Sequence, residues 1–500
     1  MRDRKLLLVA GAGGGLAGAL RAVQLGLDVV VVEANPHFRR GNNTSMSTAM
    51  VPGAGSRFQR AAGLRDSPQA FAADVAAKTH GAADPALTRA LAEVSARLVE
   101  WLADDLQLPI ELVTDFDYPG HSVCRCHTVP GRSGASLLQM LADRAGPAGI
   151  DVMTPAELTD ARTSAGGVAV GIRLPDGSAD EIPADALLLA TNGFGADSGM
   201  VGRYIPEIHR ATYHGSAWSR GHAVRIGTRL GAGTAFMDAY QGHGALTVGT
   251  GTLAGWATVM HGGIIVNRDG RRFADETQGY SEFAKLELAQ PDAWAAIVID
   301  QRIAGLCANF DDFRQTVQMG ALRWAGTPEE LAARLGVPAG QLAATIAETG
   351  QVVRGGGRDR YGRATWPAQP LTPPLAAIRV GPALFHTQGG LRIDGHARVT
   401  TSDGKVIPGL YAAGGAAMGI SGHGAAGYLA GNGLLSALGL SFLAAEHLAG
   451  QLQRRVRLGE PGRDLIRRQP GAKQRDEQDP CLDRVERARR RDPATAQVEF

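Results

Sequence analysis

The first 33 residues constrain the fold of this chain more than any other stretch. An apolar run at 5–10 leads into a glycine-rich turn, a segment with helical spacing at 16–26 and a β-branched run at 28–32 that ends at Glu33. A short, continuous apolar run is typical of a parallel strand covered on both faces, and β-branched residues favour a second strand. The pattern therefore predicts a strand, a tight turn, a helix and a parallel strand at the start of an α/β domain.

This arrangement suits a dinucleotide. Unpaired N–H groups at the start of the helix and the helix dipole both favour a diphosphate, and glycines let the backbone come close to it. Glu33 follows the second strand, 18 residues after Gly15, where an acid accepts hydrogen bonds from ribose hydroxyls. The usual G-x-G-x-x-G spacing would put its first two glycines on alanines. We therefore expect a shorter binding turn formed by Gly11, Gly13 and Gly15.

The 500 residues are enough for two or three domains. Glycine-rich segments lie between apolar runs early and late in the chain, whereas the middle has a hairpin signal at 262–276 and a Thr-capped helical start at 327. Helical patterns are also expected at about 67–80 and 85–107. The predicted division is a discontinuous nucleotide domain (1–240 and 386–452), an inserted second domain (241–385) and a polar, basic tail (453–500) that is disordered or loosely attached.

Charge and cysteine content exclude several classes of protein. The formal net charge of +2 is too small for a nucleic-acid-binding surface. Four cysteines are too few for a disulfide framework, which favours a reducing cytoplasm. The start of the chain resembles a signal peptide. Its apolar run continues into the second predicted strand, however, which favours a folded domain. We predict a cytoplasmic protein with no nucleic-acid partner.

One uncharged stretch, 409–445, could be mistaken for a membrane helix. It contains no Asp, Glu, Lys or Arg, but it holds many glycines together with His423 and Asn432. A membrane helix needs about 20 mostly apolar residues. A buried segment that faces a cofactor fits this composition better, so no membrane span is expected.

Eight segments carry a resemblance to a known family. In chain order they are VVVVEANP, GNNTSMSTAMVPGAG, ALLLATNGFG, AYQGHG, GGIIVNRDGRRFADE, FHTQGGLRID, VIPGLYAAGG and GYLAGNGLLSAL. From Gly11 to about Glu446 the chain resembles the flavoproteins that include fumarate reductases, succinate dehydrogenases, tricarballylate dehydrogenases and 3-ketosteroid Δ1-dehydrogenases. The resemblance implies a Rossmann-type FAD-binding domain with an inserted α+β capping domain that closes over the substrate at the flavin.

The resemblance also implies where FAD is held. Glu33 would bind the adenosine ribose, and the last long helix would open near Asn432 with its positive end towards the flavin. Asn43 falls near the position where succinate dehydrogenases carry a flavin-linked histidine, which implies non-covalent FAD. The positions expected to hold or line the cofactor are Gly11, Gly13, Gly15, Glu33, Asn43, Thr44, Ser45, Ser47, Gly55, Asn192, Gly193, Gly414, Gly415, Asn432, Gly433 and Leu434.

Three departures from the family pattern keep a second reading open. Asn192 stands where glycine is usual, Gly415 stands where many members have glutamate, and TAMVP replaces a glycine pair. Together with the irregular glycine turn, they leave a non-catalytic flavin-binding module as an alternative.

Four side chains are the candidates for chemistry. Forming or reducing a C=C bond beside a carbonyl needs a hydride partner, an acid or base for the other proton, and donors for a developing oxyanion. By the resemblance, His243 and His386 match positions at which fumarate reductases hold a substrate carboxylate. Tyr280 and Tyr428 stand where those enzymes have arginines. A tyrosine at 280 resembles the 3-ketosteroid dehydrogenases, in which it is the proton-abstracting base, and Tyr428 resembles those enzymes and the tricarballylate dehydrogenases.

Metal and haem chemistry find little support in the sequence. The run CRCH (124–127) offers two sulfurs and an imidazole, but no second ligand pair follows at metal-binding spacing, so no metal is expected. No C-x-x-C-H haem-attachment sequence is present. Electrons are therefore expected to pass to or from a separate acceptor or donor.

These observations predict an FAD-dependent oxidoreductase that acts on the CH–CH group next to a carbonyl or carboxyl of a small molecule, with dehydrogenation favoured. A fumarate-reductase-like enoate reductase is the first alternative, and it would need another cation for the substrate charge. A nicotinamide-dependent dehydrogenase is supported by the N-terminal turn and by nothing after residue 180.

Overall fold

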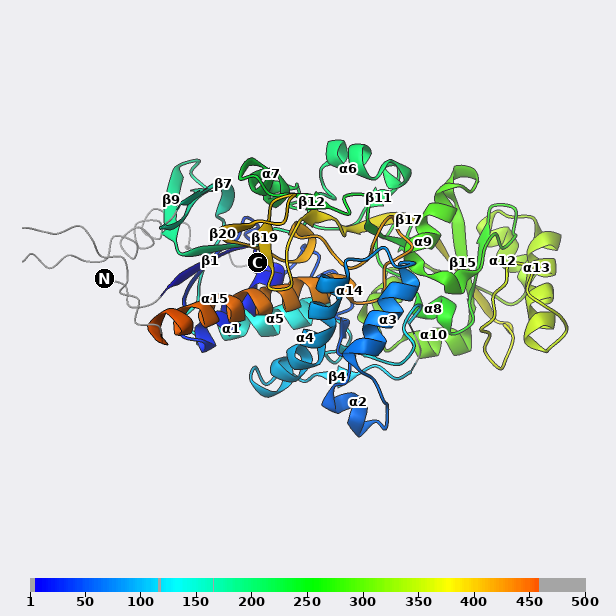
Figure 1. The fold of residues 1–500 in the computed structure, drawn as a ribbon. Helices are drawn as coiled ribbons and strands as arrows, with labels where there is room; N and C mark the ends of the chain where they lie inside the picture. The colour runs from blue at the N-terminus through cyan, green and yellow to red at the C-terminus, as the bar shows by residue number, and fades with distance from the viewer. Residues whose placement is uncertain (1–4, 116–117, 165, 458–500) are drawn as a thin grey trace, which may run out of the picture.

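A mainly parallel sheet of six strands lies at the centre of the computed structural model, which describes residues 5–115, 118–164 and 166–457 (Figure 1). The strand order is β19-β20-β10-β1-β2-β6, and within this described sheet β19 runs antiparallel to β20. All residues of β1 are buried, as the apolar run predicted. The strands are β1 (Leu6–Ala10), β2 (Asp28–Val32), β6 (Asp151–Met153), β10 (Ala186–Leu189), β19 (Arg398–Thr400) and β20 (Val406–Ala412).

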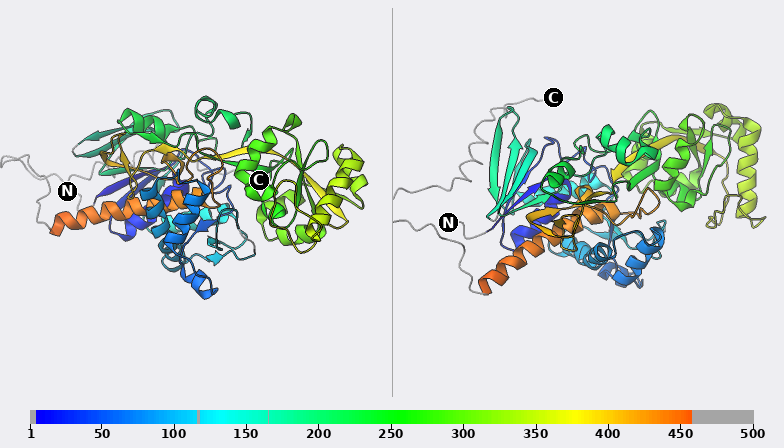
Figure 2. Two further views of the ribbon diagram at one scale, coloured as in Figure 1. Left: turned by 45° about the vertical axis from the view of Figure 1, so that its right-hand side comes forward. Right: turned by 45° about the horizontal axis from the view of Figure 1, so that its top comes forward.

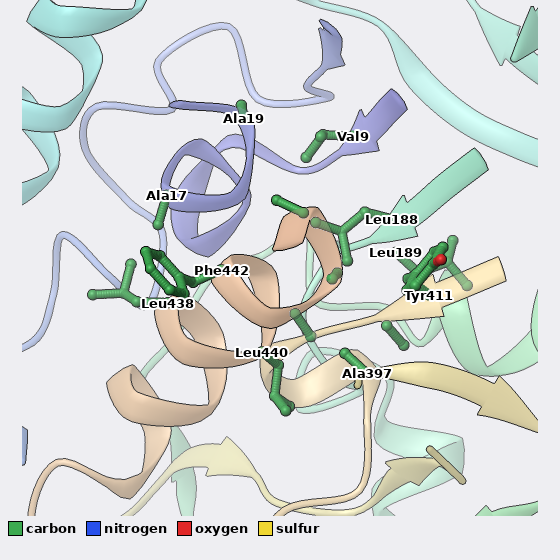
Figure 3. Close-up of a cluster of buried hydrophobic side chains, with 14 of the residues drawn as sticks. Val9, Ala17, Ala19, Leu188, Leu189, Ala397, Tyr411, Leu438, Leu440 and Phe442 are labelled. Carbon is green, nitrogen blue, oxygen red and sulfur yellow. The ribbon is translucent and has the colours of Figure 1, made fainter. Parts of the chain in front are cut away.

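Helices α1 (Ala12–Gln24) and α15 (Leu440–Arg457) cover one face of this sheet. They pack closely because a Cβ on Gly18 would lie 2.8 Å from the carbonyl oxygen of Ser441. Figure 3 shows buried apolar side chains of this layer, among them Val9 and Leu188 on the strands and Phe442 on α15 beside α1. Helix α15 is preceded by α14 (Asn432–Leu434) and a π-helical turn (Leu435–Gly439), and α5 (Gly134–Ala145) packs beside α1.

An antiparallel sheet packs on the other face, and smaller elements surround the centre. This sheet of β7, β8 and β9 lies at the end of the molecule opposite the inserted domain (Figure 2). The two helices expected from the sequence are confirmed as α3 and α4, which begin after the capping residues Ser67 and Asp84. The elements are α2 (Arg57–Ala61), α3 (Pro68–Lys78), α4 (Pro85–Asp104), α6 (Ser198–Tyr204), α7 (His222–Arg229), β3 (Val51–Pro52), β4 (Glu111–Leu112), β5 (Cys126–Thr128), β7 (Glu157–Ser164), β8 (Gly167–Arg173), β9 (Ala179–Ala184), β12 (Thr234–Ala235) and β18 (Gly390–Leu391).

The inserted domain is built on a second sheet in which β17 (Leu375–Thr387) pairs with most of the other strands. Its first half pairs with β15 and β16, and its second half pairs with β13 and β11. The expected boundaries at 240/241 and 385/386 fall inside β13 and β17. The remaining elements are β11 (Thr212–Tyr213), β13 (Tyr240–Thr247), β14 (Ile264–Asn267), β15 (Ala295–Asp300), β16 (Leu322–Ala325), α8 (Ala257–Met260), α9 (Tyr280–Leu288), α10 (Gln301–Cys307), α11 (Asp311–Gln318), α12 (Pro328–Leu335) and α13 (Ala339–Val353).

The hairpin expected at 262–276 does not form. Strand β14 and the Asp269–Gly270 turn are present, but the return segment is not a strand, and β14 pairs with β15 instead. The reason is the side chain of Arg272, which is buried and ion-paired to Glu276 and Asp359. Satisfying this buried charge turns the return segment into the domain and away from β14.

The C-terminal segment bears on two expectations. Of the described residues, 432–451 form the one helix long and apolar enough to cross a membrane by length and composition, and 67% of its most apolar stretch is buried inside the fold. This is the burial of a core helix. The expected tail begins within α15, and its residues from 458 onward lie outside the described residues.

Because α1 and α15 pack closely, alanine in place of Gly18 should lower the stability of the fold, whereas alanine in place of Gly305, another helical glycine, should not. Gly18→Ala would place a methyl group against the Ser441 backbone, and overpacking of this kind costs about 1–3 kcal/mol. Gly305→Ala in α10 is the control, because a Cβ there meets nothing within 4 Å and alanine is favoured in a helix by up to about 1 kcal/mol. Thermal unfolding should show a lower Tm for the first variant only. Equal Tm values would contradict the packing described here.

Candidate active site

A large cavity lies between the carboxyl ends of the central parallel strands and the inserted domain. About 1850 Å³ of space, part of it open to solvent, is bounded by the start of α1, the loop 42–50, the loop after β10, α9, α11, β17 and the segment around α14. The lining therefore extends without interruption from the glycine turn to side chains of the inserted domain.

The glycine turn forms one end of this cavity. Gly11 joins β1 to α1 with φ +106°, and a Cβ there would lie 2.3 Å from the carbonyl oxygen of Ala190. Gly11, Gly13 and Gly14 line the cavity. Gly15 lies behind them, where a Cβ would meet Val9 at 2.5 Å, so its place is the close packing of α1 on β1.

Glu33 also lines the cavity, directly after β2. Its carboxylate accepts hydrogen bonds from the backbone N–H groups of Ala12 (2.7 Å) and Asn35 (2.8 Å). Burial raises the pKa of Glu33, and the hydrogen bonds from backbone N–H groups oppose that rise. The carboxylate is therefore fixed beside the start of α1, as a ribose-binding acid requires.

The loop after β2 contributes Asn43, Thr44 and Ser47 to the cavity wall. The Asn43 amide donates to the carbonyl of Phe385 at 2.7 Å and accepts from the N–H of Ser216 at 2.9 Å, which joins the loop to the inserted domain. Two other expected residues lie elsewhere. Ser45 hydrogen-bonds Asn42 within the loop, and Gly55 (φ +79°) forms a turn outside the lining.

A hydrogen-bonded chain lies in the wall at the middle of the cavity. Asn192, with φ +66°, accepts from Nε2 of His386 at 2.7 Å through its Oδ1, and Nδ1 of His386 accepts from Gln388 at 2.5 Å. Both ring nitrogens of His386 are therefore engaged by the protein. Burial lowers the pKa of His386 to about 4, so this ring is neutral and oriented at physiological pH.

The remaining expected cofactor positions divide between the lining and the layer behind it. Gly414 and Gly415 line the cavity, as do Gly433 and Leu434 at the start of the last helical segment. Gly193 and Asn432 lie behind it. A Cβ on Gly193 would collide with Thr387, and Asn432 is fully buried.

Aromatic rings form the end of the cavity opposite the glycine turn. His243 stacks on Tyr280 (4.7 Å between ring centres) and on Phe385 (4.8 Å), and Tyr280 meets Tyr428 edge-on at 5.9 Å. Trp256 closes the group at 6.0 Å from His243. The structure thus brings His243, Tyr280 and Tyr428 together, while His386 lies in the adjacent wall.

A β-bulge explains why two consecutive residues of β17 reach the cavity. The register of β13 against β17 shifts between the pairs Gln241–His386 and Gly242–Leu384, which leaves Phe385 as the extra residue. A regular strand would turn these neighbours to opposite faces. Because of the bulge, both Phe385 and His386 line the cavity.

The aromatic end carries no fixed positive charge. No Lys or Arg is among the described residues that line the cavity. Burial lowers the pKa of His243 to about 3, so its ring is neutral. Its Nδ1 accepts from the N–H of Ala245 at 3.0 Å, which leaves the ring proton on Nε2. Burial raises the pKa of Tyr280 well above 10, and it raises that of Tyr428 as well.

Three buried polar atoms in the cavity wall have no hydrogen-bond partner among the described residues. They are Oγ1 of Thr191, Nε1 of Trp256 and Oδ2 of Asp312. Buried polar groups in proteins are nearly always hydrogen-bonded. Thr191 follows β10 beside the glycine turn, where a bound dinucleotide would supply the partner, whereas the other two atoms belong to the inserted domain.

Sequence reasoning did not find several of these residues. The sequence pattern does not indicate Phe385, because the bulge that exposes both Phe385 and His386 is invisible in the sequence. Trp256 and Asp312 lie in segments without a motif. Three His, Cys, Asp or Glu side chains in an arrangement that could hold a metal ion do not occur within the described part of the chain.

A dinucleotide cradle that opens into an aromatic substrate pocket defines the class of FAD-dependent oxidoreductases. The chain belongs to the FAD binding domain family, whose model matches residues 7–434. The family resemblance, the α/β fold with its FAD domain and the FAD cofactor predicted from the sequence are thereby confirmed. The cradle at Gly11, the fixed Glu33 carboxylate and the unpartnered Thr191 hydroxyl all fit that cofactor.

Several known proteins are similar to this chain. NADH:fumarate oxidoreductase of Klebsiella pneumoniae (strain 342) is 30% identical over 422 residues, which cover 83% of this chain and 45% of that protein. The chain therefore spans less than half the length of that relative. A 4-oxocyclohexanecarboxylate 2-dehydrogenase of Sinomonas cyclohexanicum is 28% identical over 541 residues, covering 89% of this chain and 93% of that protein. A flavocytochrome c3 fumarate reductase in an open conformation has a TM-score of 0.74 and 26% identity, covering 90% of this chain and 78% of that one.

The position of Asn43 predicts that FAD is held without a covalent bond. Its amide is not a nucleophile, and both ends of it are occupied by Phe385 and Ser216. Acid precipitation of the purified protein should leave yellow FAD in the supernatant, measurable by absorbance and fluorescence. Flavin that stays with the washed pellet would contradict the prediction.

Proposed function

We propose that this chain dehydrogenates a small cyclic ketone at the carbon–carbon bond next to the carbonyl. The observation that carries the proposal is the chemistry of the aromatic end of the cavity, where two tyrosines and a neutral histidine meet and no Lys or Arg is present in the described lining. The Sinomonas relative that acts on a cyclic ketone, and that this chain covers almost completely, supports the same substrate class.

The absence of a cation in this lining argues against dicarboxylates. An unpaired carboxylate in a closed, low-dielectric pocket is very costly. Arginine meets that need with two parallel hydrogen bonds, and tyrosine does not. A neutral carbonyl requires hydrogen-bond donors only, and the pocket offers several.

Two groups, Tyr428 and His243, are placed to hold the carbonyl oxygen. The backbone N–H of Gly433 donates to the hydroxyl oxygen of Tyr428 at 3.4 Å, which leaves the phenol proton of Tyr428 to donate to the carbonyl. The Nε2–H of His243 is a further donor in the same group of rings. Donors of this kind stabilise the enolate-like charge that develops when a proton leaves the neighbouring carbon.

Tyr280 is the proposed proton-transfer residue. It lies between His243 and Tyr428, next to the proposed carbonyl site. Bound FAD would supply the acceptor for the hydride that leaves the second carbon. Since burial raises the pKa of Tyr280 well above 10, the phenolate needed as a base is scarce at neutral pH and increases as the pH rises.

The same pKa shift supports reduction of an enone as a second candidate. A phenol that stays protonated is a ready proton donor, and several relatives are reductases, including fumarate reductases and a urocanate reductase. The two directions differ in their pH dependence. Dehydrogenation should accelerate from neutral to alkaline pH as the phenolate fraction rises, whereas enone reduction should stay level over this range because the phenol remains protonated. In either direction, we propose that a separate protein or diffusible carrier exchanges electrons with the flavin.

Replacement of Tyr280 by phenylalanine should separate its chemistry from its packing. Loss of a general base lowers turnover by about 10²–10⁴, while the ring and the bound FAD should remain. Dye-coupled oxidation of cyclohexanones from pH 6 to 10, together with the flavin content, measures both. Tyr204→Phe is the matched control, because Tyr204 lies outside the cavity lining and should keep the wild-type rate and pH profile.

Substrate charge gives an independent test of the proposal. The wild-type enzyme should show no significant succinate oxidation or fumarate reduction, whereas neutral cyclic ketones should bleach the flavin. Rapid fumarate reduction that survives the Tyr280→Phe change would show that the assignment of both the substrate and the proton-transfer residue is wrong.

A further inference from the structure

Asp312 is an acid that the proposed reaction does not use. It lies in the first turn of α11 and lines the cavity together with Phe310 and Phe313 of the same segment. Its Oδ2 is buried without a hydrogen-bond partner in the described part of the chain. Burial alone raises the pKa of Asp312 to about 7.

Two fully buried carboxylates in the described chain, Glu276 and Asp300, have structural partners. Glu276 is paired with Arg272 and Arg363, and Asp300 caps α10 by accepting from the N–H of Ile303. Glu287 is buried without partners too, but it lies outside the cavity lining. Asp312 therefore differs from them in being both unpartnered and open to the substrate space.

The charged groups near the start of α11 form ion pairs with one another and not with Asp312. Asp311 pairs with Arg314, and Nη2 of Arg132 pairs with Asp115. The Arg132 guanidinium lies 4.4 Å from the ring of Phe310, and its Nη1 is buried without a hydrogen-bond partner among the described residues. Burial alone shifts the pKa of Asp312. Within the described ranges, no ion pair to the carboxyl of Asp312 is formed.

Asp312 lines the same cavity as Tyr280 and Tyr428. It belongs to α11, whereas Tyr280 begins α9 and Tyr428 comes from the segment before α14. A substrate with its carbonyl at Tyr428 could reach α11 with its other end, because both line this cavity.

We propose that Asp312 determines specificity at this remote end of the substrate by accepting a hydrogen bond from a hydroxyl or ammonium substituent. Phe310 and Phe313, from the same segment as Asp312, also line the cavity, so the wall beside the carboxyl is apolar. The start of α11 favours a negative charge on Asp312. The same carboxyl would repel a substrate that carries a carboxylate group. The name of the Sinomonas relative indicates that the substrate of that enzyme carries such a group.

This inference rests on the proposed function, and a matched set of ketones tests it. The ligands are cyclohexanones with a methyl, hydroxyl, amino or carboxylate group at carbon 4. Affinity for the oxidised holoenzyme is read from the perturbation of the flavin spectrum, and turnover is read with an electron-accepting dye. The variants are Asp312→Leu and Asp312→Asn. Asp311→Asn is the control, because Asp311 precedes Asp312 on α11 and lies outside the cavity lining.

The wild type and Asp311→Asn should bind the hydroxyl and amino ketones at least tenfold more tightly than the methyl ketone. Asp312→Leu should reverse this order while keeping turnover of the methyl ketone, which shows that the fold and Tyr280 are intact. Asp312→Asn should still bind the hydroxyl ketone tightly, but it should lose the tight binding of the amino ketone. Affinity of the wild type for the amino ketone should increase as the pH rises through about 7, and this dependence should vanish in Asp312→Asn.

Two outcomes would overturn the proposal in distinguishable ways. If the wild type oxidises the methyl ketone but both Asp312 variants keep its order of preference, the role of Asp312 is wrong and the proposed function stands. If no ketone is bound or oxidised, the proposed function fails and the inference fails with it.

Discussion

The antiparallel pairing of β13 with β17 is the constraint on which the functional cavity depends. These strands connect the FAD domain with the inserted domain. Strand β17 is paired along its whole length within the sheet of the inserted domain. The hydrogen-bonded ladder fixes where Tyr280, at the start of α9, lies relative to Tyr428, which belongs to the other part of the chain. Two residues about 150 positions apart in sequence can meet at 5.9 Å because this ladder sets the register.

Electrostatics then decides what the cavity can hold. The cofactor end is polar and supplies a fixed carboxylate and the positive end of α1, while the aromatic end has a lowered pKa for its histidine and raised pKa values for its tyrosines. All of these shifts have burial as their largest cause. The lining that the inserted domain contributes therefore carries neutral groups around Tyr280 and, among the described residues, one carboxyl, that of Asp312.

The sequence was informative where local pattern and structure coincide. The apolar run of β1, Gly11, Glu33 and the capped helix α4 follow from periodicity, backbone conformation and capping, which are local properties. The family resemblance correctly indicated the FAD fold and brought His243, Tyr280 and Tyr428 forward. Reasoning from the sequence failed where a long-range contact decides the outcome. Arg272 prevents the expected hairpin by reaching Asp359, and nothing near Asp312 in the sequence reveals that its carboxyl lacks a partner.

The bulge at Phe385 makes the wall of the active site sensitive to the length of one strand. A deletion of one residue would restore the regular alternation of β17 and turn either the phenyl ring or the imidazole away from the reacting space, while the ladder on both sides could still close. Insertions and deletions, and not only substitutions, are thus a route by which related enzymes could exchange one substrate for another without rebuilding the fold.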